Sequence, residues 1–114
     1  VARQRPRSHL MADIDRFSVT AAGTDSGATA TQTASAGSTF VVTNISGHGD
    51  ADSAITIESP ASTIIWEGKK DVSVEGLPIE HGGMNVTGAK GAAILGKIAA
   101  STSDCQITIS GVIK

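Results

Sequence analysis

Residues 105–109 read Cys-Gln-Ile-Thr-Ile, with apolar side chains at the first, third and fifth positions. A period of two places these side chains on one face of a β-strand and the polar ones on the other. The same alternation recurs in Ile-Thr-Ile at residues 55–57 and in Val-Ser-Val at residues 72–74. The pattern therefore predicts half-buried strands, each with one face turned toward an apolar core.

Patterns of this kind fill the chain from Thr39 to Lys114, and turns with glycine or proline separate them at intervals of about eight to twelve residues. No segment reads as a helix, since glycines interrupt the alanine-rich stretch near residue 92. We expect seven short strands, with an eighth candidate at 17–19; the seven are 39–45, 54–58, 63–67, 71–75, 84–87, 92–100 and 105–113. This spacing predicts an all-β fold: an antiparallel β-sandwich or a jelly-roll-like barrel of seven to eight short strands.

Aromatic side chains are scarce, because 114 residues include only two Phe, one Trp and no Tyr. The length suits a single domain. Burial of apolar surface stabilises a fold by about 25 cal/mol per Å², and each small residue buries little of it. A lone monomer of this composition would therefore be marginally stable. Oligomerisation or docking on a larger body would remedy that, whereas an ordinary sandwich with an Ile/Val core could fold alone.

The first third of the chain differs from the rest. Residues 1–10 are polar and basic and are followed by a Met, so they are either an expression-vector remnant or a genuine arm. Residues 21–38 are mostly Ala, Thr, Ser and Gly, which cannot bury enough apolar area to fold by themselves. They read as a linker or as an extended segment laid on another surface. We expect an extended N-terminal arm over 1–38, with a first strand near 16–20, and a β-sandwich domain over 39–114.

Charge is distributed unevenly along a chain whose formal net charge is −2. Arg3, Arg5 and Arg7 make the start basic, while residues 11–114 hold six basic and eleven acidic residues. A basic arm can bind an acidic partner surface or nucleic acid, but three arginines on an acidic body do not favour nucleic acid. The chain has no long apolar run, so we expect no membrane-spanning segment, and its polar start predicts no secretion signal.

Few residues are candidates for chemistry. Cys105 is the only cysteine, which excludes an internal disulfide, and its place in a strand pattern predicts a buried, inert thiol. His48, Asp50 and Asp52 alternate in a loop as calcium ligands can, but the glycine and distal glutamate of an EF-hand are missing, which favours a solvated turn. We expect no catalytic residue, no metal site and no cofactor.

Trp66 is the one aromatic side chain that could stack on a sugar ring. Alternation over residues 63–67 places Ile64 and Trp66 on one face of a strand and Ile65 and Glu67 on the other. The apolar neighbour favours a core position for the indole.

Three stretches together resemble a known kind of protein. They are Thr43-Asn-Ile-Ser-Gly-His-Gly-Asp-Ala-Asp, Ile64-Ile-Trp-Glu, and Gly91-Ala-Ala-Ile-Leu-Gly-Lys-Ile-Ala-Ala-Ser-Thr-Ser-Asp-Cys-Gln-Ile-Thr-Ile-Ser-Gly. In the general character of their sequence, and not through one defining motif, residues 39–114 resemble the small, glycine- and threonine-rich β-sandwich proteins of tailed-bacteriophage virions, of the capsid cement or head-decoration kind.

The resemblance implies a non-enzymatic virion structural protein that stabilises the phage head by bridging neighbouring capsid subunits. It implies the major capsid protein as a partner, a homo-oligomer such as a trimer, and a place on the capsid surface after synthesis in the cytoplasm of the bacterial host. The residues expected to contact the partner are Arg3, Arg5, Arg7, Thr29, Thr31 and Thr33. Two other interpretations stay open: a soluble carbohydrate- or protein-binding β-sandwich module of a phage tail, a phage neck or a bacterial surface system, and a small enzyme on a jelly roll.

Overall fold

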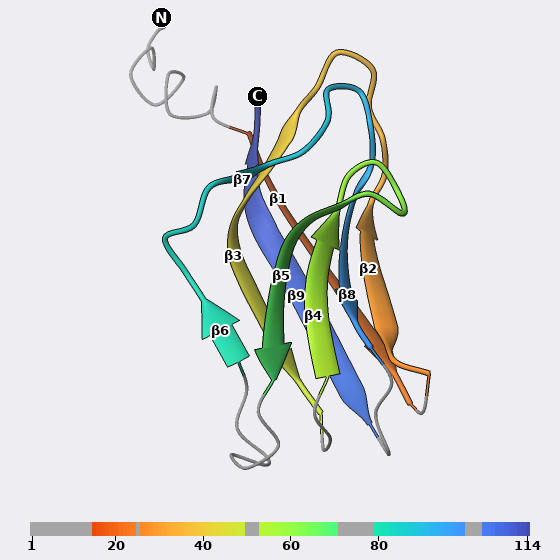
Figure 1. Ribbon diagram of the computed structural model, residues 1–114. Helices are drawn as coiled ribbons and strands as arrows, with labels where there is room; N and C mark the ends of the chain where they lie inside the picture. The colour runs from red at the N-terminus through yellow and green to blue at the C-terminus, as the bar shows by residue number, and fades with distance from the viewer. Residues whose placement is uncertain (1–14, 25, 50–52, 71–78, 100–103) are drawn as a thin grey trace, which may run out of the picture.

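The computed structural model describes residues 15–24, 26–49, 53–70, 79–99 and 104–114, and these residues form β-strands without any helix. The strands are β1 (Asp15–Gly23), β2 (Ala28–Gln32), β3 (Phe40–His48), β4 (Ser53–Glu58), β5 (Ile64–Lys70), β6 (Ile79–His81), β7 (Val86–Thr87), β8 (Ile94–Ile98) and β9 (Cys105–Ile113). They lie in two antiparallel sheets that face each other (Figure 1). The predicted all-β sandwich is therefore confirmed.

The order of the strands is that of a jelly roll. The first sheet runs β1-β9-β3-β6, with the short β7 also paired to β3, and the second sheet runs β2-β8-β4-β5. The first half of the chain pairs with the second half from the ends inward: β1 with β9, β2 with β8, β3 with β6 and β7, and β4 with β5. One long antiparallel hairpin is thus rolled up, and the ladders β3–β9 and β4–β8 hold the roll together.

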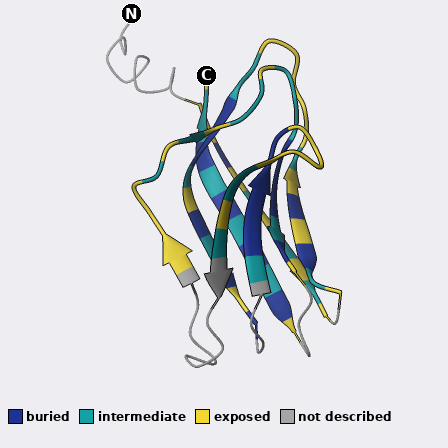
Figure 2. Ribbon diagram, in the orientation of Figure 1, coloured by how far each residue is buried: buried dark blue, intermediate teal, exposed yellow. Residues whose placement is uncertain are grey.

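The core fills the space between the sheets and consists mainly of Ile and Val. Along β9 buried residues alternate with partly exposed ones, as the pattern at residues 105–109 predicts (Figure 2). Phe17 and Phe40 add an edge-to-face ring pair with centroids 5.4 Å apart. The buried cluster comprises Phe17, Ala28, Ala30, Phe40, Val42, Ile45, Ile55, Ile57, Ile94, Ile98, Cys105, Ile107 and Ile109.

The two sheets approach each other closely at Gly96 of β8. A Cβ atom added there would overlap the side chain of Ile109 on β9, in the opposite sheet. Glycine therefore leaves the room that a large β-branched residue occupies. Small and large side chains face each other across the interior, as dense packing requires.

The N-terminal boundary differs from the expected one. Residues 15–23 form β1 in the first sheet and residues 28–32 form β2 in the second, so these two stretches belong to the sandwich and not to an arm. The small side chains of Ala28 and Ala30 are buried against the opposite sheet, and the backbone of this segment pairs with β8. Partners distant in sequence thus supply the burial that the low-complexity segment lacks by itself. Residues 1–14 lie outside the described residues.

A second difference concerns β5. The ladder between β4 and β5 shifts its register between Ile57 and Glu58, so that Trp66 pairs with Ile57 and Ile64 with Glu58. A bulge of this kind breaks the alternation of faces. Ile64 is consequently exposed by 56% on the outside, while Ile65 and Trp66 both pack against the core. The prediction that Ile64 shares a face with Trp66 is wrong for this reason.

The remaining predicted strands agree in part with the structure. The strand expected at 84–87 is reduced to β7, and the described residues include a further strand, β6, at 79–81. The strand expected at 92–100 is observed as β8 over the shorter range 94–98. The one expected at 71–75 lies outside the described residues.

Candidate interaction surfaces

The threonines expected to contact a partner lie together on one strand and its extension. Thr29 and Thr31 are exposed on β2, and because they are two residues apart they point to the same side of the strand. Thr33 is exposed immediately after β2 ends. Arg3, Arg5 and Arg7 lie outside the described residues. The structure therefore brings the three threonines together and does not place the arginines.

The edges of the sandwich differ in chemical character. On one side, β1 and β2 are the outermost strands of their sheets, and the stretches 17–23 and 28–32 contain no charged residue and no proline. On the other side, β6 and β7 have only three and two residues, and β5 carries a bulge together with the charged Glu67. Short strands, bulges and charges are features that keep sheet edges from pairing with other chains. Within the described residues, the β1–β2 side lacks these protective features.

The outer face of the first sheet carries rows of short polar side chains. Pairing across β1, β9 and β3 aligns Ser18 with Ser110 and Asn44 in one row, and Thr20 with Thr108 and Ser46 in the next. The hydroxyls of Thr20 and Thr108 are hydrogen-bonded to each other over 2.8 Å. This face is polar but, in these two rows, uncharged.

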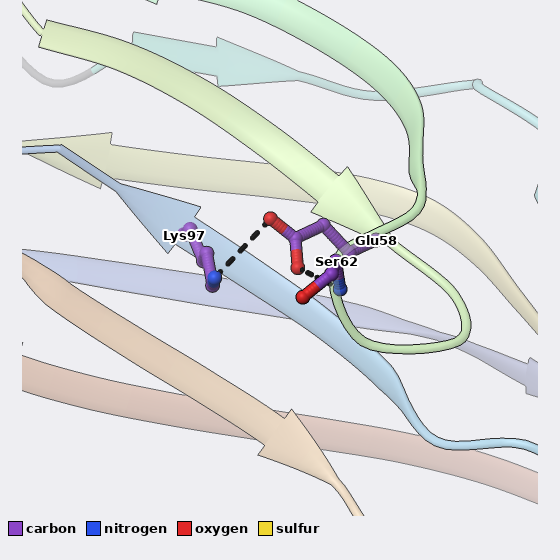
Figure 3. A network of polar contacts seen from close by, with 3 residues as sticks. All are labelled: Glu58, Ser62 and Lys97. Carbon is purple, nitrogen blue, oxygen red and sulfur yellow. Dashed lines mark hydrogen bonds and ion pairs between the residues drawn. The ribbon is translucent and has the colours of Figure 1, made fainter.

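A network of polar contacts surrounds Glu58 at the end of β4 (Figure 3). The Ser62 backbone N–H donates to Glu58 Oε1 over 2.7 Å, and Lys97 Nζ of β8 lies 3.2 Å from Glu58 Oε2. The hydrogen bond from Ser62, together with Lys97, holds the pKa of the Glu58 carboxyl below its ordinary value, although burial acts in the opposite direction. Glu58 is therefore an ionised, nearly buried carboxylate with a partner on each oxygen.

Ser59 continues this network into the neighbouring loop. Its Oγ donates to the backbone carbonyl of Ala93 over 2.7 Å and accepts from the backbone N–H of Ala89 over 2.9 Å. These bonds connect the β4–β5 turn to the segment that precedes β8. Both oxygens of Glu58 and the hydroxyl of Ser59 are engaged, so the network is suited to fixing a turn and not to proton transfer.

A hollow of about 510 Å³ opens at the end of the first sheet where β1 and β3 end and β9 begins. There, His48 Nε2 is hydrogen-bonded to Gln106 Oε1 over 3.1 Å, and the Cys105 thiol donates to the carbonyl of Thr24 over 3.7 Å. The thiol is 1% exposed, which confirms the predicted burial. The hollow is lined by Ala22, Gly23, Thr24, His48, Asp104, Cys105 and Gln106.

Metal binding finds no support in the part of the chain that the structure describes. There, no group of three or more His, Cys, Asp or Glu side chains is placed to hold a metal ion. Asp50 and Asp52, the two carboxylates considered with His48, lie outside it. His48 itself is engaged with Gln106.

Trp66 is half-buried and packs against the core, as its predicted core position requires. Its ring meets that of His81 on β6 edge-to-face, with centroids 5.2 Å apart. The indole also lies close to Gly68, where a Cβ would come within 2.8 Å of it. These neighbours cover part of the ring surface, and a sugar-stacking platform requires an open ring face.

Comparisons with known proteins do not place this chain in a family. No family model matches it, and neither the curated proteins nor the solved structures include a match. Among the described residues there is also no helix that is long and apolar enough to cross a membrane. A function has to be argued from the topology, the edges and the exposed side chains.

Proposed function

We propose that this chain is a non-enzymatic virion structural protein, a capsid cement or head-decoration protein that bridges neighbouring subunits of the major capsid protein on the outside of a phage head. The proposal includes synthesis in the cytoplasm of the bacterial host and action as a homo-oligomer. The observation that carries it is the exposed, uncharged surface of β2, where Thr29 and Thr31 point outward and Thr33 continues the row. The jelly-roll topology supports it, because viral capsid domains are among the users of this fold, although a fold alone does not define a function.

The mechanism is the burial of surface between neighbours. A specific interface buries about 1,200–2,000 Å² in total, and a protein that contacts two subunits at once resists their separation through multivalency. The threonine hydroxyls can donate and accept hydrogen bonds at such a contact without bringing in a charge that must be desolvated. Arg3, Arg5 and Arg7 would add an electrostatic contribution from the start of the chain.

The test is reconstitution on heads that lack the protein. Added protein should co-sediment with the heads to a fixed copy number and raise the temperature at which they release DNA. Thr29→Lys with Thr31→Lys should weaken this binding at least tenfold. The matched control is Ala61→Lys with Thr63→Lys, which adds the same charge at exposed positions of the β4–β5 turn and should bind normally.

The arginines are tested separately by replacing Arg3, Arg5 and Arg7 with Gln. Binding of the original chain should weaken as salt is raised, and the triple variant should lose most of that salt dependence. A chain that does not bind heads at all would overturn the proposal. Saturable binding to a glycan, lost in Trp66→Ala, would then favour the carbohydrate-binding alternative.

A further inference from the structure

The feature that carries a further inference is the free edge of β1. Within the described residues β1 pairs only with β9, and its other side has no partner strand. The strand is nine residues long, and the seven residues from Phe17 to Gly23 include no charge and no proline. A long, uncharged edge offers a row of backbone N–H and C=O groups to a strand of another chain.

We propose that β1 pairs with β1 of a second copy, antiparallel and about a twofold axis at Val19, so that the two first sheets join into one continuous sheet. A twofold contact uses the same surface on both copies, and that surface must therefore complement itself. This inference specifies the homo-oligomer included in the proposed function, but it concerns the protein by itself and holds with or without a capsid.

The sequence of β1 is self-complementary in this register. On the inner face Val19 lies opposite Val19 of the second copy, at the twofold axis. On both sides of this pair, the large side chain of Phe17 lies opposite the small side chain of Ala21 from the other copy. Val19 and Ala21 face the core but are only partly buried at this edge. A second β1 would cover them.

The outer face complements itself as well. Ser18 lies opposite Thr20 of the second copy, a pairing of hydroxyls like the bond of 2.8 Å that Thr20 makes with Thr108 on the other side. The two charged residues of the strand, Asp15 and Arg16, lie opposite Gly23 and Ala22. No like charges lie opposite each other. In this register all nine residues of β1 have a partner on the second copy, whereas any other antiparallel register leaves some of them unpaired.

Charge-swap variants at two exposed positions test the register. Ser18→Lys with Thr20→Lys places lysines opposite each other across the proposed ladder, whereas Ser18→Lys with Thr20→Glu places each lysine opposite a glutamate. Sedimentation equilibrium should give twice the monomer mass for the original chain and for the Lys/Glu variant. The Lys/Lys variant should dissociate with a dissociation constant about ten- to hundredfold higher. Ala61→Lys with Thr63→Lys carries the same added charge as Lys/Lys and should remain dimeric.

Circular dichroism verifies that each variant folds. If Lys/Lys does not fold, hydrogen exchange on the original chain decides: backbone amides of β1 should gain protection as concentration rises through the dimer range. A monomer or a trimer by mass would overturn the inference. So would equal dissociation of the Lys/Lys and Lys/Glu variants, or β1 amides whose exchange is independent of concentration.

Discussion

Glu58 and Ser62 fix the β4–β5 turn between them: the Ser62 backbone N–H donates to Glu58 Oε1 over 2.7 Å while Ser62 holds a φ of 75°. A left-handed backbone costs a residue with a side chain roughly 1–2 kcal/mol. The carboxylate thus stabilises a turn that Ser62 itself disfavours. Lys97 on the second oxygen ties the same turn to β8.

Removal of the Glu58 carboxylate should destabilise the fold. In Glu58→Ala the Ser62 N–H and Lys97 lose their partner, and we expect the free energy of unfolding to fall by about 1–3 kcal/mol. Glu58→Gln keeps an oxygen that can accept from Ser62 and should lose less. Urea denaturation measures both variants, and equal losses would contradict the importance of the Ser62 bond.

The same residue predicts a pH dependence. The pKa of Glu58 is lowered in the folded chain from its ordinary 4.5, so its contribution to stability is fully present above that value and is lost as pH falls through the folded pKa. The difference in unfolding free energy between the original chain and Glu58→Gln should stay constant from neutral pH to about pH 5 and shrink at more acid pH. Urea midpoints measured between pH 7 and pH 3 test this, and a difference that does not change with pH would refute it.

Glycine at position 62 should stabilise the protein. Ser62→Gly keeps the N–H that donates to Glu58 and removes the cost of the positive φ, against a larger loss of chain entropy. We expect a net gain of up to about 1 kcal/mol. Ser62→Ala is the control, since it keeps the strain and should change stability little. Thermal unfolding measures both variants: a loss of stability in Ser62→Gly alone would contradict the predicted gain, and a loss in Ser62→Ala as well would show that the hydroxyl has a role of its own.

A methyl group at position 96 should push the sheets apart. Gly96→Ala would overlap Ile109 and should cost about 1–3 kcal/mol. Ile109→Ala opens space at the same place, so the double variant should lose less than the sum of the two single losses. A double-mutant cycle in urea measures this coupling, and strict additivity would mean that the two positions do not share the space between the sheets.

The strands of the sandwich could be predicted where alternation is regular. The pattern at residues 105–109 predicts the buried face of β9 correctly because a strand paired on both sides keeps its period of two. The same logic failed at Ile64, since a bulge depends on the neighbouring strand and leaves no mark in the local pattern. It failed also for residues 28–32, because their backbone pairs with β8, more than sixty residues later, and their alanines are buried against the opposite sheet.

The candidate surfaces were predictable only in part. Thr29 and Thr31 could be found from their alternation with alanine, and both are exposed on one strand. The network around Glu58 could not, because alternation alone assigns this residue to a solvated strand face. Its partner Lys97 is 39 positions away and is brought close only by the pairing of β4 with β8. The free edge of β1 likewise became apparent only from the order of the strands.

The position of β9 constrains how the chain can fold during synthesis. This strand is the last in the described sequence and yet lies between β1 and β3 in the middle of the first sheet. While a ribosome is still making residues 105–113, β1 lacks its partner strand, and β3 has only β6 and β7 to pair with. Contacts between such distant segments form slowly. The first sheet therefore cannot assemble completely before residues 105–113 have left the ribosome, and loss of these residues would leave β1 without a partner and expose one side of β3.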